Sequence, residues 1–288
     1  MGEGTPSIQK FLIEAQTAAN DLRLALPSQT PGFNGRRTGS RTGNAYDFAE
    51  YRDYHPGDDL RRLDWSVFAR SEQLMVRQFN DEIDPSCDLV LDHSASMSVP
   101  PERFQAALGL AAFLMRAADN GGFSASLWHA GTTWQLEPNP TTPLQWTSLA
   151  ADSPQSPLHT IQSFHGTWRP RGLRILLSDL LWPGSPTDFL TRFSQGARQT
   201  FLICLDCMEP VSDTEATTIL VDAETGESRE VRLDPSAVAR QRQRLASHLA
   251  TWHDAAVRAG LHFLRLDAME VLHHWPIQEL ARAGLLEL

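Results

Sequence analysis

Lysine is almost missing from this sequence, since Lys10 is the only lysine among its 288 residues. A nucleotide-binding P-loop needs a lysine between its glycines and a Ser or Thr, because that lysine reaches the β- and γ-phosphates. Glycines do cluster at Gly35, Gly39 and Gly43, but Asn, Ala and Tyr follow the last of them. The sequence therefore excludes a P-loop ATPase built from this chain alone.

Long hydrophobic runs and a full set of cysteine pairs are also missing. No apolar stretch approaches the ~18–20 residues that span a bilayer, so we expect no membrane span. The opening residues MGEGTPSIQK lack a basic start followed by an apolar block, and we expect no secretory signal. Three cysteines cannot all pair with one another, which fits a reduced protein. Together these absences predict a cytoplasmic location.

Positive charge is scarce as well. The chain has 25 Lys and Arg against 35 Asp and Glu, a net charge of −10. Nucleic-acid binding draws most of its affinity from a cationic surface, so we expect no nucleic-acid partner. The surplus of carboxylates leaves room for sites that bind cations. With 41% hydrophobic residues, the chain is large enough for one core or for one core with an appended module.

Residues 1–84 are predicted to form an N-terminal helix followed by a charged, aromatic module. Apolar side chains recur at helical spacing between about residues 6 and 26, which indicates one amphipathic helix ended by Pro27. Residues 35–43 are polar and rich in glycine, and we expect a loop there.

Residues 46–82 mix aromatic side chains with closely spaced charges of both signs. Residues 56–59 (PGDD) predict a turn whose aspartates begin a short helix through Arg70, and residues 74–79 look extended. Arginine suits bidentate pairing with carboxylates, so we favour ion pairs that tie this module to the sheet over phosphate binding. The charged residues concerned are Arg61, Arg62, Asp64, Arg70 and Arg77.

Residues 85–288 alternate short apolar strands with helices, which predicts a mostly parallel sheet covered on both faces. Strands are expected over residues 88–92, 173–178, 200–206 and 261–266. Helices are expected over residues 101–119, 187–196, 235–259 and 276–286. One hairpin is expected over residues 124–129 and 132–136, and a second, inserted at about 210–235, over residues 218–222 and 228–233.

Carboxylate and hydroxyl side chains follow two of the expected strands. Asp92, Ser94 and Ser96 come directly after the first strand and lie two residues apart, so their side chains can converge. Asp179 follows the next buried strand. Adjacent strands lie ~4.8 Å apart, so the two aspartates can face one another. Ligands bind at the carboxyl ends of strands in such sheets, and these hard oxygen donors suit Mg²⁺.

This D-x-S-x-S pattern with a later Asp resembles the metal-ion-dependent adhesion site of von Willebrand factor A domains. The run Pro56-Gly-Asp-Asp-Leu-Arg-Arg-Leu-Asp-Trp65, followed by Ala69-Arg70 and Met97, is similar to the MoxR-associated bacterial family known as domain of unknown function 58. Glu209-Pro210 and Leu220-Val-Asp222 also follow that family's pattern. The resemblance extends from about residue 35 to 266 and implies a von Willebrand factor A-like, Rossmann-type fold.

The resemblance also implies a set of ligands. Asp92, Ser94 and Ser96 would bind the metal, and Asp179 would be a ligand or an anchor behind the ligands. The adhesion site takes a further threonine from an intervening loop. Thr160 and Ser156 are the candidates here, with Thr142 behind them. The implied ion is Mg²⁺, or Mn²⁺ or Ca²⁺ in its place.

The implied function is cation-dependent protein binding. One open position on the ion would take a Glu or Asp from a client protein. A MoxR-type AAA+ ATPase would be the partner, and the pair would act in protein maturation or chaperone-like assembly. We therefore expect a binding protein, not an enzyme.

Other interpretations remain open. Asp92 and its serines can simply cap a helix or a strand end. A metal-dependent hydrolase, a phosphatase or an esterase, is the main alternative, although the second Asp of an aspartate-nucleophile phosphatase is replaced by Ser94, and the G-x-S-x-G elbow is absent. A scaffold with a decayed metal site is another. We expect structural roles for Cys204 and Cys207, and we expect no metal site among the scattered histidines His93, His129, His165, His273 and His274.

Overall fold

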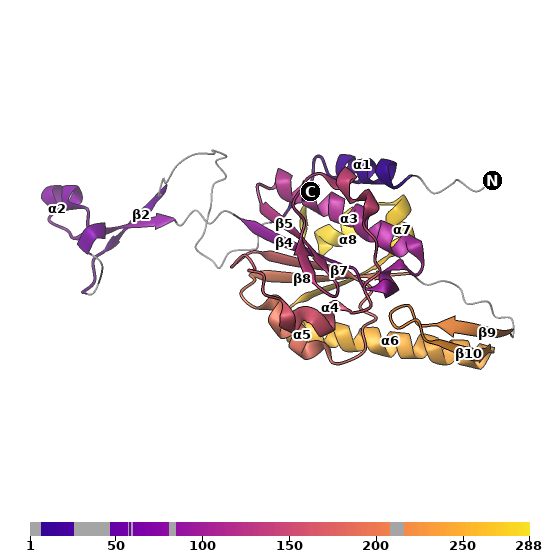
Figure 1. Cartoon of the computed structure of the whole chain (residues 1–288). Coiled ribbons are helices and arrows are strands. Elements are labelled where there is room, and N and C mark those ends of the chain that lie inside the picture. Colours follow the sequence, from indigo (N-terminus) through magenta and orange to yellow (C-terminus); the bar gives the residue numbers. More distant parts are fainter. Residues whose placement is uncertain (1–6, 26–46, 57, 59, 81–84, 208–215) are drawn as a thin grey trace. The chain divides into compact units, whose positions relative to one another are not determined.

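The computed structural model describes residues 7–25, 47–56, 58, 60–80, 85–207 and 216–288 (Figure 1). The chain divides into two compact units, one of residues 1–29 with 85–288 and one of residues 30–84. The glycine-rich segment 35–43, Asp59 and Glu209-Pro210 lie outside the described residues.

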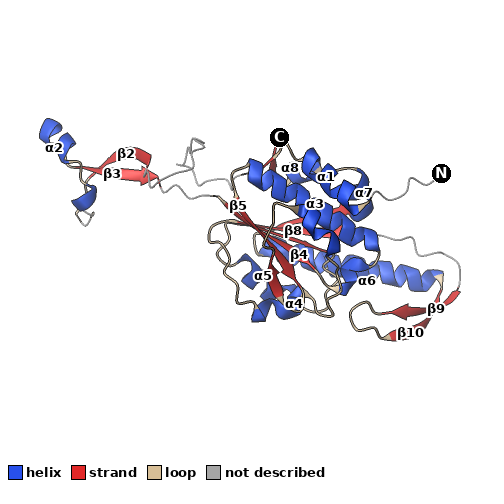
Figure 2. Cartoon of the chain, turned by 45° about the horizontal axis from the view of Figure 1, so that its top comes forward, coloured by secondary structure: helices blue, strands red, loops and turns tan. Residues whose placement is uncertain are grey.

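A six-stranded sheet forms the centre of the larger unit, in the order β11-β8-β7-β4-β5-β6 (Figures 1 and 2). Five neighbouring strands run parallel, and only β6 at the edge is antiparallel. This confirms the mostly parallel sheet that the sequence predicts. The strands are β4 (Ser86–Asp92), β5 (Ser124–Ala130), β6 (Trp134–Leu136), β7 (Leu173–Ser178), β8 (Gln199–Asp206) and β11 (His262–Asp267).

Helices cover both faces of this sheet, and a separate hydrophobic core lies under each layer (Figure 2). Side chains alternate along each strand, so Leu89 and Leu91 enter one core while Val90 enters the other. The first layer holds α1 (Ile8–Ala18), α3 (Pro101–Asn120), α7 (Ala268–His273) and α8 (Ile277–Arg282). The second holds α4 (Pro157–Thr160), α5 (Pro186–Ser194) and α6 (Pro235–Arg258).

Helix α3 is buried on nearly every side because α1 and α7 pack on its outer surface. The approach of α1 is close: a Cβ placed at Gly109 would lie 2.1 Å from Cε1 of Phe11. Only glycine fits at that crossing without a shift of the Phe11 ring. The apolar residues all round α3 therefore follow from its central place in the layer.

The N-terminal helix differs from the prediction in its length and its grouping. We expected one helix over about residues 6–26, grouped with the charged module. In the structure α1 ends at Ala18, and β1 (Arg23–Leu24) follows. Helix α1 packs on α3, so the helix belongs to the larger unit because its buried residues complete that unit's core.

The C-terminal helix is also shorter than predicted. Helix α8 ends at Arg282, not near residue 286, and β12 (Leu286–Glu287) pairs antiparallel with β1. Gly284 has a φ of +77°, a conformation that suits glycine and turns the chain out of the helix. Pairing between two segments so far apart in the sequence cannot be read from local spacing.

The smaller unit contains β2 (Asp47–Asp53), β3 (Met75–Asn80) and α2 (Trp65–Ser71), with a 3₁₀ turn at Leu60–Arg62. Strands β2 and β3 form an antiparallel pair. We expected the aspartates at 58 and 59 to begin the helix. Instead, Asp64 caps α2 by accepting from the backbone N–H of Ser66 at 2.8 Å, while Asp58 pairs with Arg52.

Two strands form a hairpin apart from the main sheet, β9 (Ala216–Val221) and β10 (Ser228–Leu233), as the sequence predicts. The hairpin packs on α6 through β10 (Figure 1). Short 3₁₀ turns at Ala95–Ser98 (η2), Pro143–Ser148 (η3) and Ile161–Ser163 (η4) complete the larger unit. Within the described ranges, no helix is long and apolar enough to cross a bilayer.

Candidate metal centre at the ends of β4 and β7

Asp92 and Asp179 lie at the carboxyl ends of two adjacent parallel strands. Leu91 of β4 pairs in register with Leu177 of β7. The last residue of β4, Asp92, therefore lies beside the last residue of β7, Ser178, and Asp179 follows directly. Both carboxylates are almost fully buried, with 0% and 2% of their surface exposed. The two aspartates therefore follow or end neighbouring parallel strands, as the sequence predicts.

Backbone and side-chain donors hold the carboxylate of Asp92. Its Oδ1 accepts from the backbone N–H of Ser94 at 2.8 Å. Its Oδ2 accepts from the hydroxyl of Ser178 at 2.7 Å and from the indole Nε1 of Trp182 at 3.0 Å. A carboxylate oxygen has two lone pairs, so these last two bonds use both lone pairs of Oδ2.

A buried arginine holds the carboxylate of Asp179. The guanidinium Nη1 of Arg103, on α3, donates to Oδ2 of Asp179 at 3.0 Å and to the carbonyl oxygen of Ser96 at 2.9 Å. The backbone N–H of Leu181 donates to Oδ1 at 3.0 Å. Arg103 is 6% exposed, so its charge acts on Asp179 with little screening by solvent.

Two serine hydroxyls connect the aspartates. Ser94 hydrogen-bonds to Asp92 through its side chain, and Ser96 hydrogen-bonds to Asp179. The two hydroxyl oxygens lie 3.2 Å apart. One of the two hydroxyls donates a hydrogen bond to the other. We call Asp92, Ser94, Ser96 and Asp179 the oxygen cluster.

The electrostatics of the oxygen cluster also favour a cation. Burial, with a further contribution from the negative charge of Asp179, raises the pKa of Asp92 to about 7. Burial likewise raises the pKa of Asp179, while Arg103 opposes that shift. Two buried carboxylates facing a single arginine leave one negative charge uncompensated. The donor set of carboxylate and hydroxyl oxygens is the kind that Mg²⁺ and Mn²⁺ bind, so the residues present fit a divalent ion.

The intervening-loop candidates lie outside the oxygen cluster's hydrogen bonds. The hydroxyl of Thr160 donates to the carbonyl oxygen of Gly131 at 2.8 Å and accepts from Nε1 of Trp134 at 2.9 Å. The hydroxyl of Ser156 lies 2.9 Å from Nδ1 of His159, and Thr142 is exposed. The structure therefore brings together the four residues of the oxygen cluster, and Thr160 stays a prediction whose hydroxyl has two other partners.

Sequence reasoning missed three residues that hold the oxygen cluster in place, Arg103, Ser178 and Trp182. Arg103 had a signal, since it is a charged residue near the start of a helix that is otherwise apolar on most sides. Trp182 had none, because its indole reaches Asp92 across 90 residues of sequence.

His93 and Cys204 each contact a backbone carbonyl oxygen. Burial lowers the pKa of His93 to about 4, and its ring faces the carbonyl oxygen of Ala150 and the ring of His129. The Cys204 thiol donates to the carbonyl oxygen of Asp179 at 3.5 Å, and burial raises its pKa. In the described part of the chain, no three His, Cys, Asp or Glu side chains are arranged to hold a metal ion.

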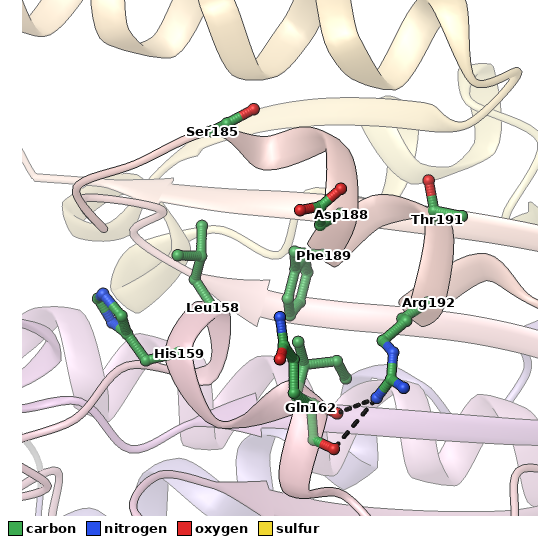
Figure 3. A pocket seen from close by; sticks show the side chains of 9 residues that line it. Leu158, His159, Gln162, Ser185, Asp188, Phe189, Thr191 and Arg192 are labelled. Atoms are coloured by element: carbon green, nitrogen blue, oxygen red, sulfur yellow. Dashed lines mark hydrogen bonds between the residues drawn. The ribbon is translucent and has the colours of Figure 1, made fainter.

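A hollow of about 650 Å³ lies elsewhere, between α4, η4 and α5 (Figure 3). His159 lies at one end and Arg192 at the other, where Nη1 of Arg192 donates to the carbonyl oxygens of Ile161 and Gln162. No residue of the oxygen cluster lines this hollow. This pocket and the oxygen cluster are therefore separate features of the larger unit.

Comparison with known proteins gives a family match over most of the chain. The family described as "Protein of unknown function DUF58" matches residues 50–251. Uncharacterized proteins of Mycobacterium bovis and of two strains of Mycobacterium tuberculosis are 27% identical over 238 residues, which cover 76% of this chain and 74% of theirs. The structure of the conserved hypothetical protein BatB from Bacteroides thetaiotaomicron aligns with a TM-score of 0.37 and 15% identity, over 69% of this chain and 98% of that one. The family match includes the whole oxygen cluster.

Proposed function

This chain belongs to the DUF58 family, and we propose that it is a protein-binding module whose oxygen cluster holds a divalent cation. The cation, Mg²⁺ or Mn²⁺, would take ligands from Asp92, Ser94 and Ser96, with Asp179 as a ligand or as an anchor through water. One position would stay open for a carboxylate of a client protein. The proposal makes the chain a von Willebrand factor A-like binding protein and not an enzyme.

One observation carries the proposal: two buried aspartates and two serine hydroxyls converge at the ends of β4 and β7. Plain helix or strand capping needs one acceptor, whereas here four side chains from two loops share hydrogen bonds. A buried pair of carboxylates with one arginine is costly unless more positive charge is present. A divalent ion supplies that charge, and it can bind a carboxylate from outside.

We extend the proposal to a partner. A cation that binds one external carboxylate suits a client protein with an exposed Asp or Glu, recruited together with a MoxR-type AAA+ ATPase. The chain cannot supply nucleotide hydrolysis through a P-loop of its own, since its single lysine is Lys10. A separate ATPase would provide the energy for maturation or assembly of the client.

Thermal unfolding with and without Mn²⁺ tests the site. Mn²⁺ should raise the melting temperature of the wild type, because a ligand that binds only the folded state stabilises it. Asp92→Ala and the double variant Ser94→Ala with Ser96→Ala should lose this response. The control variant Asp119→Asn, which changes an exposed acid, should keep it. An equal response in wild type and Asp92→Ala would show the assignment to be wrong.

A pull-down tests the function. The wild type should retain the AAA+ ATPase of its own genome in Mg²⁺ and release it in a chelator, and Asp92→Ala should not retain it. Retention that is unaffected by the chelator and by Asp92→Ala would rule out cation-dependent binding.

A further inference from the structure

Two histidines and a glutamate form a chain of hydrogen bonds that starts directly after Asp92. The Nδ1 atom of His93 lies 2.8 Å from the carbonyl oxygen of Ala150. Its Nε2 atom lies 2.8 Å from Nδ1 of His129, a residue of β5. Nε2 of His129 in turn lies 3.0 Å from Oε2 of Glu137, which directly follows β6. We call His93, His129 and Glu137 the histidine relay.

The histidine relay is shielded from solvent along its length. His93 is 9% exposed, and the side chains of His129 and Glu137 are 13% and 12% exposed. The ring of Phe104, on α3, packs edge-on against the ring of His93 with their centroids 5.1 Å apart. Buried polar atoms need partners, and each ring nitrogen of the relay has one within the protein. These contacts therefore hold both rings in defined orientations.

The hydrogens of the relay can be counted from its contacts. A carbonyl oxygen and an ionised carboxylate only accept, so the three hydrogen bonds need three ring N–H groups. Two neutral imidazole rings carry two such groups, and the third hydrogen is an extra proton. Burial lowers the pKa of His93 to about 4, so that ring is neutral and the extra proton belongs to His129. An imidazolium–carboxylate pair of His129 and Glu137 thus orients the neutral ring of His93.

The other end of this chain reaches the loop that carries the two serines of the oxygen cluster. The backbone N–H of His93 donates to the carbonyl oxygen of Ala130 at 2.8 Å, and its carbonyl oxygen accepts from Ser153 at 2.9 Å. The backbone N–H of Ala95, which lies between the two serines, donates to the carbonyl oxygen of Ser153 at 2.9 Å. The ring of His93 therefore holds one end of segment 150–153, and the serine loop pairs with the other end.

We propose that His129 and Glu137 are positioning residues for the oxygen cluster and that they act through His93. This inference rests on the proposed function. The relay sets the place of the His93 ring, the ring sets segment 150–153, and that segment sets the loop whose hydroxyls would bind the cation. No residue of the relay touches the ion. Residues that orient metal ligands from behind contribute about 10–100-fold to metal affinity.

Titration with Mn²⁺, followed by the EPR signal of the free ion, compares two changes at residue 137. Glu137→Leu removes the acceptor and should weaken Mn²⁺ binding at least about tenfold. Glu137→Gln should bind within about twofold of wild type, because its amide N–H supplies the third hydrogen of the relay without an extra proton. Asp254→Leu is the matched control and should equal wild type, since Asp254 pairs with the exposed His253 at 3.2 Å.

A double-mutant cycle tests the route through His93. When Glu137 acts through the ring of His93, Glu137→Leu should cause no further loss of Mn²⁺ affinity in a His93→Leu background. Losses that add would mean that Glu137 affects the oxygen cluster by another route, and they would overturn the inference.

The ring protonation tests the relay in the unchanged chain and without a metal. At neutral pH, ¹⁵N NMR of the imidazole nitrogens should show hydrogen on both nitrogens of His129 and on Nδ1 alone of His93. A His129 ring with hydrogen on a single nitrogen would mean that the relay does not form, and the inference would be wrong.

The outcomes separate this inference from the proposal beneath it. Binding of Mn²⁺ by the wild type and its loss in Asp92→Ala, with equal affinity in wild type and Glu137→Leu, would overturn the inference alone. No Mn²⁺ binding by the wild type, or equal binding in Asp92→Ala, would overturn both.

Discussion

Arg103 on α3 donates to Asp179 after β7 at 3.0 Å, although the two residues lie 76 positions apart in the sequence. The pair sets the charge of the oxygen cluster, because Arg103 is a fixed cation that compensates one of two buried carboxylates. The other carboxylate has no such fixed cation, and its charge is the one that the proposed divalent ion would balance. The predictions that follow depend on this balance and on the packing around it.

Removal of Arg103 should make the fold depend on added cation. Arg103→Met leaves Asp179 buried without its partner, and loss of one member of a buried pair costs about 3–5 kcal/mol. Mn²⁺ should recover part of that loss, so its effect on the melting temperature should be larger in Arg103→Met than in wild type. Arg116→Met, on the exposed side of the same helix, is the control. A smaller Mn²⁺ effect in Arg103→Met would contradict the charge balance.

The cation-free protein should lose stability as the pH rises from about 4 toward 7. The pKa of Asp92 is about 7 in the folded protein and 3.8 ordinarily, so the folded state holds the extra proton in this window. Stability from this group is present below the ordinary pKa and falls as pH rises, by up to about 1.4 kcal/mol per pH unit. Urea unfolding in a chelator measures the slope. Asp92→Asn should flatten it, and saturating Mn²⁺ should do the same in wild type.

Two buried tryptophans offer a matched comparison. Trp182 donates its Nε1 hydrogen to Asp92. Trp252 is also fully buried, with its ring centroid 5.4 Å from that of Trp182, but its Nε1 has no hydrogen-bond partner among the described residues. Both changes to Phe remove similar volume, but only Trp182→Phe removes a hydrogen bond to a charged group, worth about 1.5–3 kcal/mol. Chemical denaturation should show the larger loss for Trp182→Phe. Equal losses would mean that the indole bond does not hold Asp92.

The crossing of α1 and α3 should tolerate no side chain at residue 109. Gly109→Ala places a methyl group against Phe11, and overpacking of this kind costs about 1–3 kcal/mol. Replacing the Phe11 ring by the smaller side chain of leucine, in Phe11→Leu, should relieve the clash with the new methyl group. The double variant should therefore be more stable than the sum of the two single changes predicts. Strict additivity in urea denaturation would argue against a direct contact.

Much of the fold was predictable because it depends on local pattern. Four of the six residues 173–178 are Leu or Ile, and β7 spans that range. The spacing of Asp92, Ser94 and Ser96 after a strand placed them in one loop, and parallel neighbours put Asp179 beside them. Residue spacing also predicted the β9–β10 hairpin. No pattern in the sequence indicated where its turn would lie.

The sequence by itself determined the strand and helix order, the parallel sheet and the pair of acidic strand ends, because these follow from periodicity and from residues close along the chain. Only the tertiary structure decided which charges meet there. Arg103 and Trp182 reach the oxygen cluster from two other segments, and nothing local links them to Asp92 or Asp179. Burial in the packed fold, which removes solvent and brings distant charges together, gives the site its electrostatic character.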